Sequence, residues 1–128
     1  MKSESIIYHE PNYRTEIANL QLLRVSLTKE HSKFDFGYQA TDHYIKGGWV
    51  RIGKNTFIRV KGSNKKHILV RAENIPIGPD VHHFETTKDW LYFSLYFPPL
   101  SIENGIIDLI ENEKNTKGDF NFWDIVLK

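Results

Sequence analysis

A run of eight residues, Trp90 to Phe97, constrains the fold of this chain more than any other stretch. In an extended strand, alternate side chains point to opposite sides. One side of this run is then wholly apolar and belongs in a core, and it consists of Leu91, Phe93, Leu95 and Phe97. The other side is large but amphipathic, with Trp90, Tyr92, Ser94 and Tyr96. The run predicts a strand that is covered on both sides or that uses its aromatic side as a contact surface.

The same alternation recurs along the chain and predicts about eight strands. We expect them at residues 17–27, 34–40, 49–52, 56–60, 68–72, 90–97, 106–111 and 120–127. In the first of these the apolar positions change phase between Leu22 and Leu23, which predicts either a β-bulge or a strand that bends between two sheets. The polar turn Gly53-Lys-Asn55 predicts a hairpin that joins residues 49–52 to residues 56–60.

Many short strands at this spacing are typical of a β-sandwich or a barrel. The chain has 128 residues and no cysteine, and a single domain of this size buries a sufficient core without disulfides. We therefore predict an all-β protein with one antiparallel β-sandwich domain over residues 17–128. Residues 1–16 are expected to form an N-terminal arm that includes Ile6-Ile7-Tyr8. The sequence has no apolar run of membrane-spanning length and no leader-like start, so we expect a cytoplasmic protein.

Motifs for catalysis or metal binding are missing from the sequence. The six histidines do not have zinc-site spacing, and no nucleophile elbow or phosphate-binding glycine loop occurs. The prediction is a protein without enzymatic activity, catalytic residues, metal site or cofactor. Asp108 and Asp124 lie within apolar strands, and we expect them to point outward. If either is buried, a basic side chain from residues 43–72 would have to pair with it.

Charge is distributed unevenly. Residues 43–72 carry eight basic and no acidic side chains, whereas residues 73–128 carry four basic and ten acidic ones. The favoured interpretation is that basic strands lie beside acidic strands and form cross-strand ion pairs. The alternative is an anion-binding patch for nucleic acid or another polyanion. Its candidate residues are Arg51, Arg59, Lys61, Lys65, Lys66 and Arg71.

The aromatic side of the 90–97 strand is the leading candidate for a binding site. Contiguous exposed aromatic patches are rare on monomers and usually mark contacts. We expect Trp90, Tyr92 and Tyr96 to bind a protein partner or a second copy of the chain, as a homodimer. Either the N-terminal arm folds back over this side or another subunit covers it, and an arm exchanged between subunits would combine the two in a swapped dimer. A stacking platform for sugars or nucleobases is the other possibility.

Several segments together resemble a known class of domain. They include Trp49-Val-Arg-Ile, Ala72-Glu-Asn-Ile-Pro, Tyr92-Phe-Ser-Leu-Tyr-Phe-Pro-Pro and Phe120-Asn-Phe-Trp. The pattern is similar to small immunoglobulin-like β-sandwich domains of uncharacterised bacterial proteins. The resemblance implies an immunoglobulin-like fold and supplies no catalytic residues. The leading functional hypothesis is a non-enzymatic protein-interaction module. A polyanion binder is the second hypothesis and a carbohydrate-binding module the third.

Overall fold

The computed structural model describes residues 5–40, 48–115 and 119–128. Over these residues the chain forms strands and connections and no helix. The strands are β1 (Ile6–His9), β2 (Arg14–Thr15), β3 (Leu20–Leu27), β4 (Ser32–Gln39), β5 (Trp49–Val50), β6 (Phe57–Val60), β7 (His67–Ile68), β8 (Arg71–Glu73), β9 (His82–His83), β10 (Trp90–Phe97), β11 (Gly105–Ile110) and β12 (Phe122–Leu127). All eight predicted segments contain strands. The additional ones are the short β1, β2 and β9, and the predicted strand at 68–72 is divided between β7 and β8.

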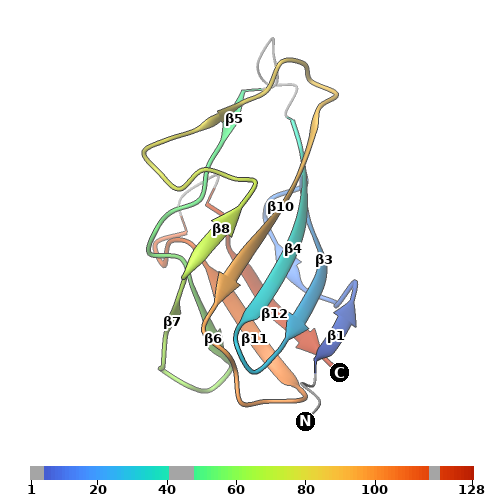
Figure 1. Cartoon of the computed structure of the whole chain (residues 1–128), viewed down its shortest axis with the longest axis vertical. Coiled ribbons are helices and arrows are strands. Elements are labelled where there is room, and N and C mark those ends of the chain that lie inside the picture. The colour runs from blue at the N-terminus through green and yellow to red at the C-terminus, as the bar shows by residue number, and fades with distance from the viewer. Residues whose placement is uncertain (1–4, 41–47, 116–118) are drawn as a thin grey trace.

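Two antiparallel sheets pack face to face (Figure 1). In the described part of the chain, sheet 1 has the order β1-β3-β4-β10-β8 and sheet 2 has the order β2-β12-β11-β6-β7. A further small pair, β5-β9, extends one end of the sandwich. The structure confirms the predicted all-β, single antiparallel sandwich. The more specific immunoglobulin-like arrangement stays a prediction.

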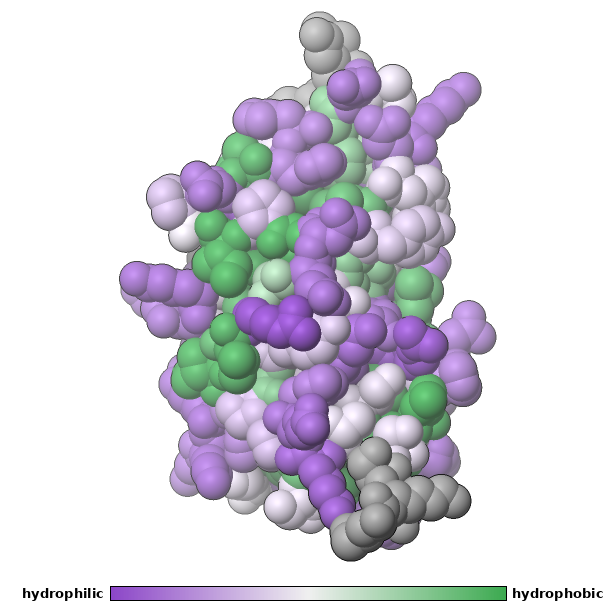
Figure 2. All heavy atoms as spheres, in the orientation of Figure 1, coloured by the Kyte–Doolittle hydropathy of each residue, from purple (hydrophilic) through white to green (hydrophobic). Residues whose placement is uncertain are grey.

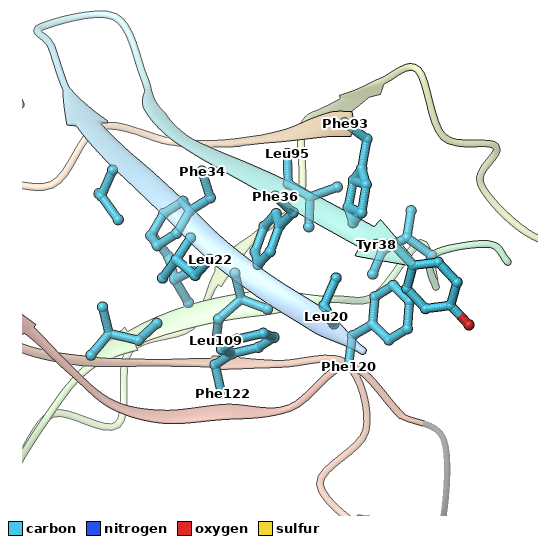
Figure 3. Close-up of a cluster of buried hydrophobic side chains, with 14 of the residues drawn as sticks. Leu20, Leu22, Phe34, Phe36, Tyr38, Phe93, Leu95, Leu109, Phe120 and Phe122 are labelled. Atoms are coloured by element: carbon cyan, nitrogen blue, oxygen red, sulfur yellow. The ribbon is translucent and has the colours of Figure 1, made fainter. Parts of the chain in front are cut away.

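The core fills the space between the sheets, and both contribute aromatic side chains to it (Figure 3). Phe36 of β4 stacks on Phe93 of β10, with ring centroids 5.1 Å apart, and meets Phe122 of β12 at 5.4 Å. The predicted apolar side of the 90–97 strand is buried here. The register inferred from alternation is therefore confirmed. It also means that the aromatic side of β10 faces away from sheet 2.

The residues predicted as an N-terminal arm contain an edge strand for each sheet. β1 pairs with β3, and β2 pairs with β12. Tyr8 of β1 is buried in the core, which anchors this segment to its own sheet. Because β3 and β4 separate β1 from β10, β1 does not cover the aromatic side of β10.

Two local predictions have opposite outcomes. The bulge is confirmed, because the β3–β4 register shifts between Leu22 and Arg24. The hairpin between residues 49–52 and 56–60 is wrong, although a turn does form where Thr56 N donates a hydrogen bond to Gly53 O at 3.2 Å. After the turn the chain enters sheet 2, where β6 pairs with β11 and β7, whereas β5 pairs with β9. A turn sets the direction of the chain, but the best available pairing and burial decide its neighbours.

Between β7 and β8 the chain crosses from sheet 2 to sheet 1. Leu69 N donates to Thr56 O in sheet 2, and Val70 N donates to Tyr96 O in sheet 1, both at 2.8 Å. The alternation of Ile68, Val70 and Ala72 therefore does not mark one continuous strand. This crossing places Arg71 and Glu73 beside β10, at the edge of its outward side.

Candidate functional site

The outer face of sheet 1 carries the candidate site. Cross-strand register places Tyr92 opposite Gly37, Ser94 opposite Asp35, and Tyr96 opposite Lys33. Arg24 of β3 lies on the other side of Asp35, and Glu73 of β8 lies opposite Ser94. Figure 2 shows this side of the molecule, with hydrophilic side chains along its middle and hydrophobic residues gathered toward β7 and β8. Antiparallel pairing thus brings polar groups from four strands onto one surface.

Trp90 and Tyr92 form an exposed aromatic pair on this face. Their side chains are 45% and 61% exposed, and their rings are nearly parallel, with centroids 6.1 Å apart and an interplanar angle of 12°. Gly37 lies beneath both rings. A β-carbon placed there would lie 3.3 Å from Cε1 of Tyr92 and 3.5 Å from Cζ3 of Trp90. The absence of a side chain on Gly37 therefore lets both rings approach β4.

Tyr96 is on the same side of β10 but is only 6% exposed. The Arg71 guanidinium covers its ring, with Cζ 3.7 Å from the ring centroid, and His31 packs against its edge. The Tyr96 hydroxyl donates a hydrogen bond to Glu73. Of the three aromatic residues predicted as partner contacts, Trp90 and Tyr92 are accessible. Tyr96 instead supports Arg71 and Glu73 from below.

A hollow of about 560 Å³ lies beside the aromatic pair. It is lined by Leu23, Arg24, Lys33, Asp35, Phe36, Glu73, Asn74, Tyr92, Phe93 and Ser94. Among these lining residues, Asp35 accepts hydrogen bonds from Arg24 Nε at 2.8 Å and from Ser94 Oγ at 2.6 Å. Asn74 follows the last residue of β8 and has a φ of 64°. Its side-chain Nδ2 donates a hydrogen bond to Tyr92 O at 2.6 Å. Sequence reasoning missed these polar residues. The signal that could have found them is that Lys33 and Asp35 alternate with the buried Phe34 and Phe36 along one strand.

The hollow keeps its carboxylates ionised. Burial by itself would raise the pKa of Asp35, but hydrogen bonds from Ser94 and Arg24 and the charge of Lys33 outweigh it, and the pKa is lowered. For Glu73, the hydrogen bonds from Tyr96 and Arg71 lower the pKa. Both side chains are therefore acceptors at neutral pH.

The Asp35 interactions predict an acid-sensitive contribution to stability. Because the pKa of Asp35 is lower in the folded protein than its ordinary value of 3.8, the contribution is present above that value. It is lost as the pH falls through the folded-state pKa. We expect wild-type protein to lose more free energy of unfolding than Asp35→Asn on acidification below about pH 4. Urea unfolding of both proteins across this range measures the difference, and parallel pH profiles would contradict the prediction.

Most of the candidate anion-binding residues form ion pairs within the described chain. Arg59 lies 3.6 Å from Asp108, Lys61 lies 2.8 Å from Asp124, Lys66 pairs with Glu113, and Arg71 lies 3.3 Å from Glu73. Neither Arg51 nor Lys65 pairs with an acid among the described residues. Arg51 instead donates to Pro79 O and lies over the ring of Trp49. Residues 43–47 of the basic segment are outside the described residues. The cross-strand pairs match the interpretation favoured from the sequence.

Asp108 is buried, at 3% exposure, so the expectation that it points outward is wrong. The β11–β12 register passes from Ile107–Ile125 to Leu109–Phe122, which leaves two residues of β12 opposite Asp108 alone. In this bulge Asp124 has a φ of 54° and its backbone N–H donates to Asp108 Oδ1 at 3.0 Å. Arg59 and Lys61 supply the basic partners that a buried carboxylate needs.

The described residues contain no group of three or more histidine or acidic side chains placed to hold a metal ion. Nor do they include a helix long and apolar enough to cross a membrane. Comparisons of the chain with protein-family models, curated proteins and solved structures found no match in any of the three.

Proposed function

We propose that this domain is a non-enzymatic interaction module that binds its partner across the outer face of sheet 1. The observation that carries the proposal is the exposed pair of Trp90 and Tyr92 at the border of a polar hollow. Tryptophan and tyrosine are enriched among the residues that dominate binding energy. The neighbouring pair here, with nearly parallel rings, leaves 45% of Trp90 and 61% of Tyr92 exposed as an apolar contact area.

The two rings also stand on a paired strand. Trp90 and Tyr92 lie on β10, where β4 pairs with both residues and the Asn74 side chain donates a hydrogen bond to Tyr92 O. Side chains on a loop would lose conformational freedom on binding, whereas these rings already pack against Gly37. Such preorganisation reduces the entropy lost in association. This supports recognition by the sheet face itself.

Charge pairing argues against the polyanion alternative. Arg59, Lys61 and Lys66 are partnered by acids from the C-terminal strands and the loop between them. An anionic ligand would have to compete with these carboxylates. A partner that binds the outer face of sheet 1 through aromatic contacts does not have to displace these ion pairs. A second copy of this chain is one such partner.

The proposal predicts that binding depends on the aromatic pair. Wild-type protein is screened against glycan, peptide and oligonucleotide arrays, and its self-association is measured by light scattering. We expect Trp90→Ala and Tyr92→Ala each to weaken the selected interaction at least about tenfold, because hot-spot residues have effects of this size. Trp49→Ala is the matched control, since Trp49 is 49% exposed on β5, outside sheet 1. Binding that survives both substitutions on β10 would place the site elsewhere.

A further inference from the structure

We propose that the ligand of this face is a neutral carbohydrate chain, with its sugar rings stacked against the Trp90–Tyr92 pair and neighbouring hydroxyls in the adjoining hollow. This inference rests on the proposed function, because it assigns a ligand class to the same surface. Three features carry it: the orientation of the two rings, the balance of charge in the hollow, and the extent of the hollow across the sheet.

The aromatic pair suits the apolar face of a sugar ring. A pyranose carries several C–H groups on one face, and these have partial positive charge. The face of an aromatic ring is its negative side, so the two surfaces attract each other as well as excluding water. Trp90 and Tyr92 have nearly the same ring orientation, at 12° to each other. Because the two rings are stacked on each other, each offers the face turned away from the other ring to a sugar ring of the chain.

The residues that line the hollow combine donors and acceptors and carry as many positive as negative groups, and Arg71 lies beside Glu73 at the border. Arg24 and Lys33 contribute two positive groups, and Asp35 and Glu73 contribute two negative ones. A hydroxyl both donates and accepts hydrogen bonds, so a polyol can use both kinds of group. A polyanion would meet Asp35 and Glu73, and a polycation would meet Arg24 and Lys33. The charge balance therefore favours a ligand that is polar and uncharged.

The polar groups are held in place and retain capacity for a ligand. A carboxylate can accept about four hydrogen bonds. Asp35 receives two from protein side chains, from Arg24 and Ser94. Glu73 is fixed by Tyr96 and Arg71, yet its side chain is half exposed. Hydroxyls that reach either carboxylate would find acceptors whose orientation is already set, as a preorganised site requires.

The extent of the hollow fits a chain better than a single small molecule. Its lining residues come from β3, β4, β10 and the end of β8. Neighbouring strands lie about 4.8 Å apart, so a groove crossing four of them is about 14 Å long. Its volume of about 560 Å³ is within the usual range of about 300–1,000 Å³ for ligand sites. Tyr92 lines the same hollow, so stacking and hydrogen bonding occur side by side.

Titration calorimetry with neutral hexasaccharides tests the inference, using linked glucose, xylose and mannose series. We expect at least one series to bind wild-type protein with little dependence on salt, since no net charge is neutralised. Tyr92→Ala and Trp90→Ala should weaken this binding at least about tenfold. Tyr92→Phe should keep it within a few-fold, because stacking needs the ring and not the hydroxyl. Trp49→Ala should bind like the wild-type protein, and circular dichroism of each variant checks folding.

Other outcomes separate this inference from the proposed function. If no neutral series binds, but a peptide or a second copy of the chain binds in a Tyr92-dependent manner, the carbohydrate assignment is overturned and the interaction module stands. Exclusive binding of acidic polysaccharides or nucleic acid, falling steeply with salt, would also overturn it. If a hexasaccharide binds equally well to Trp90→Ala and Tyr92→Ala, both proposals fail for this face.

Discussion

Replacing Phe93 by alanine is expected to lower the free energy of unfolding by about 3–5 kcal/mol. Phe93 is buried where the two sheets meet. Its ring stacks on Phe36 at 5.1 Å and lies 6.3 Å from the ring of Phe120, which follows the loop after β11. Truncation would leave a cavity bounded by the aromatic rings of Phe36 and Phe120, and such surroundings collapse poorly. Urea unfolding followed by far-ultraviolet circular dichroism measures the change.

Tyr92→Ala provides the matched comparison for Phe93→Ala. It removes an aromatic ring from the preceding residue of the same strand, but from the outward side. We expect its cost in free energy of unfolding to stay below about 1 kcal/mol, as is usual for surface substitutions. A larger cost for Tyr92→Ala than for Phe93→Ala would mean that the assigned sides of β10 are reversed.

Replacing Asp108 by alanine is expected to lower the free energy of unfolding by about 2–4 kcal/mol. The substitution removes the hydrogen-bond acceptor of the Asp124 backbone N–H. That hydrogen bond helps to hold Asp124 in the bulge, where its φ is 54°. The substitution also leaves Arg59 and Lys61 without their shared carboxylate. The effect should be smaller than that of breaking a fully buried ion pair, because both cations remain partly exposed to water.

Two variants separate the contributions at Asp108. Asp108→Asn keeps an oxygen that can accept a hydrogen bond from Asp124 N and removes only the charge. It should therefore lower the free energy of unfolding by less than Asp108→Ala does. Glu113→Ala removes the exposed partner of Lys66 and should change stability by less than about 1 kcal/mol. Equal, small effects for Asp108→Ala and Glu113→Ala would contradict a structural role for the buried carboxylate. They would also favour the alternative that residues 43–72 bind an anion.

Much of the architecture follows from local patterns in the sequence. Alternation identified the buried and outward sides of the 90–97 strand, and the change of phase after Leu22 identified the bulge in β3. These predictions succeed because a side chain's direction in a strand depends only on its position along that strand. For the same reason, Trp90 and Tyr92 could be placed on the outward side before any neighbour was known.

Alternation does not specify which strands lie side by side, and the remaining features depend on that. The pairing of β5 with β9, the crossing from β7 to β8, and the burial of Tyr96 beneath Arg71 all arise from segments distant in the sequence. Asp35 and Ser94 are 59 residues apart, yet they are hydrogen-bonded to each other in the lining of the hollow. The sequence by itself determined the eight main strand segments, the buried side of the 90–97 strand and the aromatic candidates. Only the tertiary structure decided which aromatics remain exposed, which charges are neutralised and where a ligand-sized hollow forms, because each of these depends on contacts between strands.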